Sequence, residues 1–244
     1  MLKKRDLALI QDISDVHKEH PAYGHKRIAW ELGINHKRTA RVMSRYGIKP
    51  PRRKVKKTWT TIFSDNHNYS NLIKDVVPDR IDFIFVSDLT YIKYQGKFIY
   101  LAGVEDIFTR ELVSAGIGTK HDSALALSTV KMAITKRVPE IFHSDQGTEF
   151  MAKATTDYIE SKGVKISVSD KASPWQNGYK ESFFGRFKEE FGDVNRFDTL
   201  GELMAAIYGH ISYYNNKRIH TALKMPPAVF RQKVSDSCLP KRGT

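Results

Sequence analysis

Three acidic residues occupy positions where the predicted secondary structure could bring their carboxylates together. Asp88 lies within the run IDFIFVSDLTYIKY, whose apolar, β-branched and aromatic residues predict a strand in which an unpaired charge would be costly. Asp145 follows the short apolar run EIFHS and stands just past the end of another predicted strand. Glu181 lies in the predicted helix YKESFFGRFKEEF. If the two strands are neighbours, that helix could cover Asp88 and Asp145.

Clustered carboxylates repel one another, and a cation that neutralises them removes that cost. Oxygen ligands suit the hard cations Mg²⁺ and Mn²⁺, which also bind substrate phosphates. Two such ions, roughly 3.5–4 Å apart, can stabilise both oxygens of an in-line phosphoryl displacement. The three carboxylates therefore predict metal-dependent phosphoryl transfer with two Mg²⁺ or Mn²⁺ ions.

Each carboxylate also has an ordinary structural explanation. An Asp close before a Gly usually forms a turn, and a Glu on a charged helix is usually solvated. The apolar surroundings of Asp88, and the rigid turn SPWQNG directly before the helix of Glu181, favour the catalytic interpretation. His143, beside Asp145, could tune a metal-bound water, but a structural histidine is the favoured explanation.

The elements that must position these residues form an α/β pattern. Three strands in succession, which favour antiparallel pairing, are followed by a helix, a strand, a helix, a strand and two further helices. This order predicts a mixed five-stranded sheet flanked by helices. The predicted strands cover residues 81–94, 97–108, 110–119, 140–145 and 164–169, and the predicted helices cover residues 123–138, 148–163, 179–191 and 199–216.

A small helical segment precedes this body. Helices are predicted over residues 2–18, 25–32 and 36–47, with Gly33 ending the second and Asn35 capping the third. The last two fit a helix-turn-helix unit, although a purely structural helical hairpin would give the same pattern. Basic residues on the last helix favour DNA contact; they are Lys37, Arg38, Arg41 and Arg45.

The net charge of +13 is unevenly distributed along the 244 residues. Residues 1–60 hold 16 Lys and Arg against 5 Asp and Glu, and the remainder is close to neutral. A basic segment on a near-neutral body predicts binding to nucleic-acid phosphates. After the helical segment, a Pro-led basic linker supplies further predicted DNA contacts, namely Arg52, Arg53, Lys54, Lys56 and Lys57.

Three blocks carry a family resemblance: FVSDLTYI, FHSDQGTEF and SPWQNGYKESFFGRFKEEF. They resemble the signature blocks of the integrase-type, second-reading-frame transposases of the IS-three insertion-sequence family. That family belongs to the retroviral integrase superfamily, so the resemblance implies a ribonuclease-H-like fold. YGHKRIAWELGINHKRTARVMSRYGI resembles the family's DNA-binding segment, and YYNNKRIHTALKMPPAVF resembles its C-terminal block.

By this resemblance, Asp88, Asp145 and Glu181 are the metal-binding catalytic triad. Lys188 matches the basic residue placed near the DNA end, and Asn177 matches the Asn before the catalytic Glu. The implied reaction is metal-dependent strand cleavage followed by 3′-hydroxyl strand transfer. A hydrolysing ribonuclease-H-like nuclease and a non-catalytic DNA-binding regulator or relic are the alternatives. The residue three before Asp88, often Trp in the family, is Phe85 here.

The predicted organisation is a basic helical DNA-binding domain at 1–48, a basic linker at 49–75, a catalytic core with a C-terminal helical block at 76–232, and a tail at 233–244. The predicted partners are double-stranded DNA, as element ends and target, further copies of this chain, and the first-reading-frame product. One cysteine, Cys238, and histidines without nearby cysteines predict no zinc site. No apolar run is long enough to span a bilayer, so we expect no membrane partner and a bacterial cytoplasmic, nucleoid-associated protein.

Overall fold

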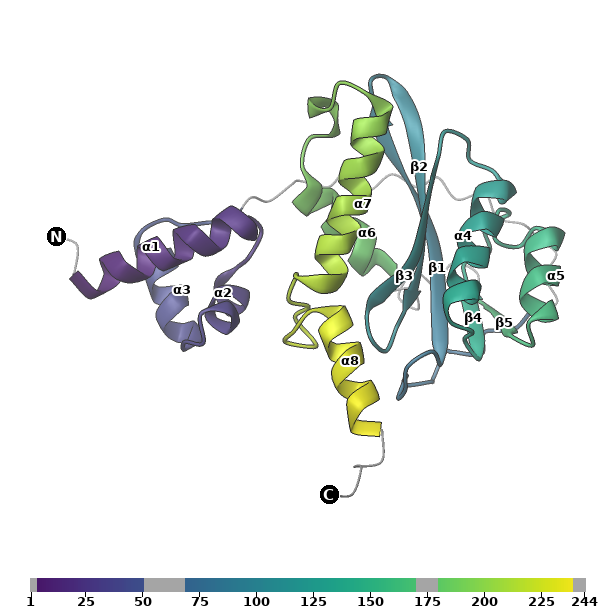
Figure 1. Ribbon diagram of the computed structural model, residues 1–244, viewed down its shortest axis with the longest axis horizontal. Helices are drawn as coiled ribbons and strands as arrows, with labels where there is room; N and C mark the ends of the chain where they lie inside the picture. The colour runs from purple at the N-terminus through teal and green to yellow at the C-terminus, as the bar shows by residue number, and fades with distance from the viewer. Residues whose placement is uncertain (1–3, 51–68, 170–179, 239–244) are drawn as a thin grey trace.

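The computed structural model describes residues 4–50, 69–169 and 180–238, without the side chains of residues 4, 180–182 and 238. Within these residues, five strands form one sheet in the order β3-β2-β1-β4-β5 (Figure 1). The first three strands pair antiparallel, and β4 pairs parallel with both β1 and β5. The predicted mixed five-stranded sheet is confirmed. The strands are β1 (Ile84–Tyr94), β2 (Lys97–Asp106), β3 (Glu111–Gly118), β4 (Ile141–Ser144) and β5 (Lys165–Val168).

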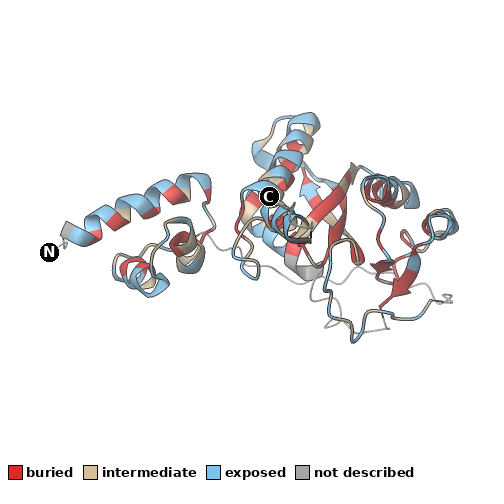
Figure 2. Ribbon diagram, turned by 60° about the horizontal axis from the view of Figure 1, so that its bottom comes forward, coloured by how far each residue is buried: buried red, intermediate tan, exposed pale blue. Residues whose placement is uncertain are grey.

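Helices cover both faces of the sheet, and each face has its own apolar core. On one face, α4 (Ser123–Lys136) and α5 (Lys153–Ser161) pack over Phe85 and Phe142. On the other, α6 (Lys180–Phe191) and α7 (Leu200–Asn216) pack over Ile92 and Leu101. The buried residues lie where helices and sheet face each other (Figure 2). The alternation of side chains along β1 therefore supplies both cores at once.

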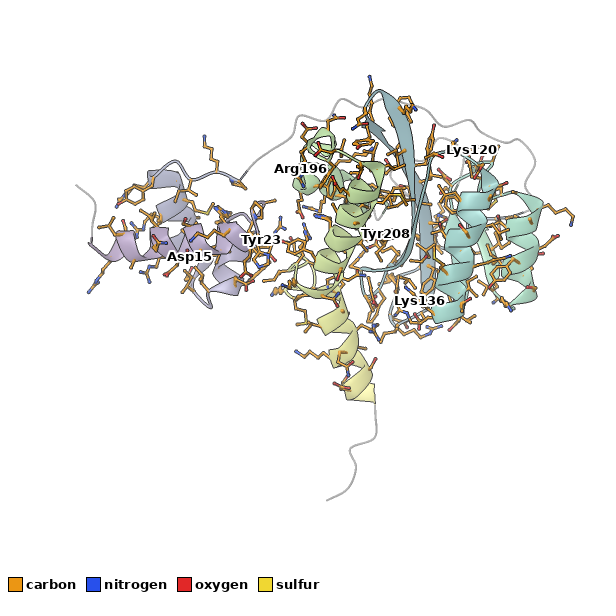
Figure 3. All side chains as sticks on the ribbon, turned by 45° about the horizontal axis from the view of Figure 1, so that its top comes forward. Asp15, Tyr23, Lys120, Lys136, Arg196 and Tyr208 are labelled. Atoms are coloured by element: carbon orange, nitrogen blue, oxygen red, sulfur yellow. The ribbon has the colours of Figure 1, made fainter. Side chains whose placement is uncertain are left out.

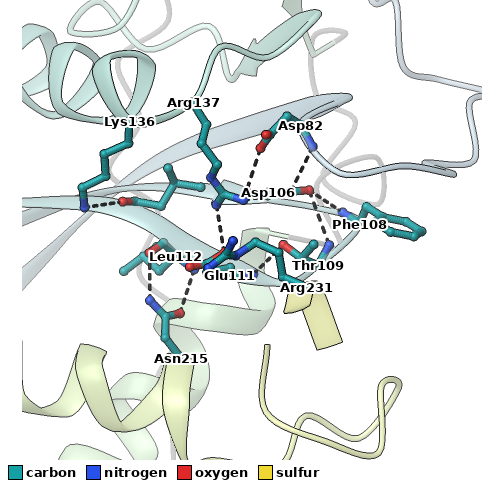
Figure 4. Close-up of polar contacts among 11 residues, drawn as sticks. Asp82, Asp106, Phe108, Thr109, Glu111, Leu112, Lys136, Arg137, Asn215 and Arg231 are labelled. Carbon is teal, nitrogen blue, oxygen red and sulfur yellow. Dashed lines mark hydrogen bonds and ion pairs between the residues drawn. The ribbon is translucent and has the colours of Figure 1, made fainter. Parts of the chain in front are cut away.

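The last helix, α8 (Pro227–Cys238), was not predicted, and the predicted boundary at residue 232 falls inside it. Ionic contacts fix α8 to the sheet (Figure 4). Nε of Arg231 on α8 lies 2.9 Å from the Glu111 carboxylate on β3. Arg137, which follows α4, lies 2.9 Å from the same carboxylate. One glutamate thus joins α8 and the end of α4 to the sheet.

The N-terminal helices are α1 (Lys4–Glu19), α2 (His25–Glu31) and α3 (His36–Arg45). Gly33 takes the left-handed conformation after α2, with φ of 63°, and the Asn35 side chain accepts a hydrogen bond of 2.8 Å from the Lys37 amide. The predicted turn and N-cap are confirmed. The three helices share an apolar cluster with Ile219, from the segment after α7.

This helical unit is held to the body by polar contacts. The Tyr23 hydroxyl accepts a 2.6 Å hydrogen bond from the Ile219 amide, and Figure 3 shows Tyr23 between the two parts. His20 Nδ1 lies 2.8 Å from the Tyr213 hydroxyl on α7. The unit is therefore docked on the α7 side of the body.

Residues 69–75, assigned to the linker by sequence, lie against the sheet. The Val168 amide of β5 donates to the Ser70 carbonyl, and the Leu72 amide donates to the Ser167 hydroxyl. The rest of the basic stretch, 51–68, is outside the described residues. Among the described helices, none has the length and apolarity needed to cross a membrane.

Candidate active site

Strand pairing brings Asp88 and Asp145 to the same level of the sheet. In the parallel register Val86 is level with His143, and continuing that register by two residues makes Asp145 level with Asp88. Because β4 ends at Ser144, the second half of β1 pairs with β2 alone among the residues that the structure describes. The expectation that these two strands are neighbours is confirmed, and both aspartates lie at an open stretch of the β1 edge.

A cavity of about 320 Å³ lies at this edge and contains both aspartates in its wall. Both side chains are half-buried. The wall is completed by the β1 and β2 residues Leu89, Tyr91, Phe98 and Tyr100, and by His121, Gly147, Glu149 and Phe150. The cavity therefore combines carboxylates with an aromatic surface.

The Asp145 carboxylate is held by the turn that follows β4. The Gly147 amide donates a 3.1 Å hydrogen bond to Oδ1 of Asp145. A Cβ on Gly147 would lie 2.9 Å from that oxygen and 3.1 Å from Oε2 of Glu149. The glycine thus leaves room for two carboxylates beside one turn. The Asp88 carboxylate accepts a 2.8 Å hydrogen bond from the Leu89 amide.

His143 is a structural histidine. Its side chain is buried, and its two ring nitrogens lie 2.9 Å from the Ser167 hydroxyl and 3.1 Å from the Ser169 hydroxyl. Both polar atoms therefore have partners in and beside β5, as the favoured interpretation predicted.

Helix α6 covers the face of the sheet to which Asp88 belongs. Asp88 is directly opposite Gly103 on β2, and such pairs share a face. A Cβ on Gly103 would lie 3.3 Å from the Phe184 ring of α6. Glu181 is the second residue of this helix; its side chain is outside the described residues, as is Asn177. Phe183, Phe184 and Phe187 are buried core residues.

Lys188, on α6, lies beside the cavity. Its Nζ is 5.1 Å from the centroid of the Tyr91 ring, one of the wall residues. A cation at this place would attract a phosphate that approaches the two aspartates. The structure therefore brings Lys188, Asp88 and Asp145 to one region of the surface.

The predicted DNA-contact residues on α3 fall into two groups. Lys37 and Arg38 are exposed. Arg41 and Arg45 are also exposed, but they lie 2.9 Å and 3.3 Å from the buried carboxylate of Asp6 on α1. The hydrogen bond from Arg41, with the charge of Arg45, holds the pKa of Asp6 below its ordinary value. These two arginines have a structural partner that the sequence did not reveal, and the linker contacts at positions 52–57 are outside the described residues.

Arg218, which follows α7, is a structural residue. It is 1% exposed, and its guanidinium makes two hydrogen bonds of 2.6 Å to the Glu190 carboxylate on α6. Arg27 of α2 lies 3.4 Å from the same carboxylate. Burial alone would raise the pKa of Glu190, but the hydrogen bonds from Arg218 and the charges of both arginines hold it below its ordinary value.

Asp88 and Asp145 fit a hard divalent cation. They offer carboxylate oxygens in one cavity, which is the donor set that Mg²⁺ and Mn²⁺ prefer. Among the side chains described, no three His, Cys, Asp or Glu groups are placed to hold a metal. The third predicted ligand, Glu181, is not among those side chains.

Sequence reasoning missed Glu149 and His121 in the cavity wall. Nδ1 of His121 lies 3.1 Å from the Glu149 carboxylate, whose side chain is 16% exposed. Glu149 lies in the turn before α5, which begins at Lys153 and not at residue 148 as predicted, and His121 comes from the segment before α4. The sequence offered a signal for Glu149, because this acidic residue is close to Asp145 along the chain. It offered none for His121, which reaches Glu149 only through the tertiary structure.

The chain is similar in sequence to known protein families. Two family models, both described as an integrase core domain, match residues 82–174 and 162–227. The uncharacterized 31 kDa protein of insertion element IS600 from Shigella sonnei is 31% identical over 95% of this chain and 89% of that protein. The InsK protein of Escherichia coli K12, a putative transposase for insertion sequence IS150, is 28% identical over 91% of this chain and 82% of that protein.

Solved structures share the fold. The catalytic core domain of HTLV-2 integrase, in complex with magnesium, superposes with a TM-score of 0.51 at 19% identity, over 62% of this chain and 96% of that chain. A simian T-cell lymphotropic virus intasome structure superposes with a TM-score of 0.53 at 14% identity, over 94% and 76%. The body is thus a ribonuclease-H-like integrase fold. The chain belongs to the IS-three family of insertion-sequence transposases as its integrase-type, second-reading-frame product, and is a DNA transposase.

Proposed function

We propose that Asp88, Asp145 and Glu181 are the catalytic carboxylates of this transposase and act in DNA strand cleavage followed by 3′-hydroxyl strand transfer. The observation that carries the proposal is the shared cavity of Asp88 and Asp145 at the open edge of β1. The position of Glu181 on α6, the helix over the face of Asp88, supports the third assignment.

The reaction is two successive displacements at phosphorus. First, a water oxygen attacks the scissile phosphorus while the bond to the 3′-oxygen breaks, and the proton lost by water balances the one gained by the leaving oxygen. Next, the freed 3′-hydroxyl attacks a target phosphorus and displaces the target's own 3′-oxygen. One phosphodiester replaces another in the second step, so the chain needs no energy-rich cofactor.

Asp88, Asp145 and Glu181 would hold a pair of Mg²⁺ or Mn²⁺ ions. When bound, such ions stabilise the charge that develops on the attacking and leaving oxygens. Lys188 orients the DNA end by contacting a phosphate, and Asn177, the Asn that precedes the catalytic Glu in sequence, contacts the same DNA. The Asp145 turn keeps one carboxylate in place through the Gly147 amide.

The proposed partners are element-end and target duplexes, further copies of this chain on that DNA, and the first-reading-frame product. The exposed Lys37 and Arg38 on α3, with the basic stretch after it, would supply phosphate contacts. We place this activity in the bacterial cytoplasm at the nucleoid, where such DNA is found.

Product analysis tests the proposed reaction. The purified chain, with the first-frame product added in a parallel sample, is incubated with Mg²⁺ and a duplex copied from the DNA that flanks the gene. We expect nicked ends and then molecules in which the 3′-end is joined to a second duplex. Cleavage with no joined product in either sample would contradict strand transfer and leave the nuclease alternative.

A further inference from the structure

The active-site cavity continues away from the carboxylates as an aromatic surface. Tyr91 stands three residues beyond Asp88 on β1, roughly 10 Å along a strand. It is directly opposite Tyr100 of β2, and Phe98 lies two residues from Tyr100 on the same face. The Tyr91 and Phe98 rings meet edge to face, with centroids 5.2 Å apart and planes at 82°. All three aromatic side chains line the cavity.

Core packing does not account for Phe98. The residue is 49% exposed and stands near the start of β2, directly opposite Lys93 of β1. A large aromatic side chain that stays exposed beside a reactive site is a typical feature of a binding surface. The surface also carries a positive charge, because Nζ of Lys188 lies 5.1 Å from the Tyr91 ring.

We propose that Tyr91 and Phe98 form a subsite that stacks one nucleobase of the DNA strand whose phosphate lies at Asp88 and Asp145. A nucleotide combines a flat π-face with an anionic phosphate, and this end of the cavity offers aromatic rings beside the Lys188 ammonium. The inference rests on the proposed function, since it names a substrate group bound in the same cavity.

Such a subsite would accept a base that has left the DNA stack. Stacking on an aromatic ring is insensitive to base identity because every base has a π-face. Leaving the duplex costs least for a base that is already mispaired. The subsite therefore favours element ends whose base pair next to the scissile phosphate is disrupted, without selecting a base there.

Binding measurements on the full chain, in Ca²⁺ to prevent turnover, test this. The probe is a duplex copied from the element end, either intact or with a single abasic nucleotide at each of the positions flanking the scissile phosphate. We expect one abasic position to weaken binding by about 5- to 100-fold in the wild type. Phe98→Ala should weaken the intact duplex by a similar factor, and the two losses should not add.

Two further variants separate stacking from general damage. Phe98→Leu keeps an apolar side chain without a π-face and should lose the same preference for the intact base. Tyr208→Ala removes an aromatic residue of similar exposure, 45%, on α7 outside the cavity wall, and should bind as the wild type does. A mismatch placed at the position where the abasic nucleotide weakens binding should tighten binding to the wild type and not to Phe98→Ala.

The inference is overturned if no abasic position changes the affinity, or if abasic and Phe98→Ala losses simply add. Either result leaves the catalytic assignment intact, because that assignment is judged by strand joining in an Asp145→Asn variant. Conversely, joining by Asp145→Asn would refute the catalytic proposal even where the base-stacking result holds.

Discussion

Asp145 is positioned by the residue two places after it. The Gly147 amide binds its carboxylate, and the missing Cβ of Gly147 leaves space for Asp145 and Glu149 together. A side chain at this position would meet carboxylate oxygens rather than backbone. The backbone can therefore stay in place while the carboxylates move.

Gly147→Ala should separate activity from folding. The new methyl would lie 2.9 Å from Oδ1 of Asp145, so that oxygen must shift. Because small misplacements of catalytic groups have large kinetic effects, we expect strand joining to fall by roughly 10- to 100-fold with an unchanged unfolding midpoint. Gly209→Ala on α7, whose Cβ would have no neighbour within 4 Å, is the matched control and should join strands normally. Normal joining by Gly147→Ala would contradict this account of the turn.

For single residues, sequence patterns predicted a role where the neighbours along the chain define it. Asp88 in an apolar strand and Asp145 at a strand end could be identified in this way. The pairing of Arg41 and Arg45 with Asp6 could not, because the contact joins different helices of the N-terminal unit. His121 was missed for the same reason: its contact with Glu149 depends on tertiary structure.

Among the elements, α6 is the one on which the site depends most. Its N-terminal end carries Glu181, and near its C-terminal end Glu190 is bound by Arg218 and Arg27. The pair with Arg218 is largely buried, with side chains 1% and 8% exposed. Loss of one partner would leave a buried charge uncompensated.

Glu190→Gln should therefore destabilise the protein by about 3 kcal/mol, because it removes the charge between two arginines. Urea unfolding followed by circular dichroism measures the change. Asp157→Asn breaks an exposed ion pair with Lys153 and should cost less than about 1 kcal/mol. A cost for Glu190→Gln as small as this control would show that the pair does not hold α6.

His210 makes the packing of α7 on α6 sensitive to acid. Its ring lies edge-on to Phe187 and Phe191, with centroids 5.3 and 5.7 Å away, and burial lowers the pKa of His210 to about 4. A pKa lower in the folded than in the unfolded protein means that stability is lost as the pH falls below about 6.5 towards about 4. His210→Phe should flatten this fall in the urea midpoint. An unchanged pH profile of the urea midpoint in His210→Phe would contradict this role of His210.

The order of the strands and of the helices up to α7 followed from hydrophobic periodicity and turn residues. Helix α8 did not, because its sequence, PAVFRQKVSDSC, gives a weak apolar pattern after two prolines. Its attachment depends on Arg231 and Glu111, a contact between distant segments. Periodicity detects a helix by its buried face, and α8 contacts the rest of the protein through this ion pair and through the Phe230 ring, whose centroid lies 5.5 Å from that of Phe108.

Across the whole molecule, a basic helical unit is docked on a near-neutral catalytic body. Tyr23, His20 and Arg27 contact residues of the body, so the unit has a defined place beside α6 and α7. Lys37 and Arg38 are exposed on α3, whereas Arg41 and Arg45 are paired with Asp6. The two groups should behave differently when they are replaced.

A Lys37→Ala, Arg38→Ala double variant should bind element-end DNA more weakly and lower the slope of log affinity against log salt by about 2, with an unchanged unfolding midpoint. Arg41→Ala should instead lower stability, because it leaves the Asp6 carboxylate with a weaker set of partners. Fluorescence anisotropy at several salt concentrations and urea unfolding distinguish these effects. An unchanged salt slope in the double variant would contradict phosphate contact by α3.

We propose that the carboxylates at the open edge of β1 carry out the chemistry. The most direct measurement is strand joining by Asp145→Asn, which keeps the size of the side chain and removes its charge, in parallel with Asp157→Asn on α5. We expect Asp145→Asn to bind element-end DNA but to lose cleavage and joining by at least about 1,000-fold, whereas Asp157→Asn should be as active as the wild type. Joining by Asp145→Asn at the wild-type rate would contradict it.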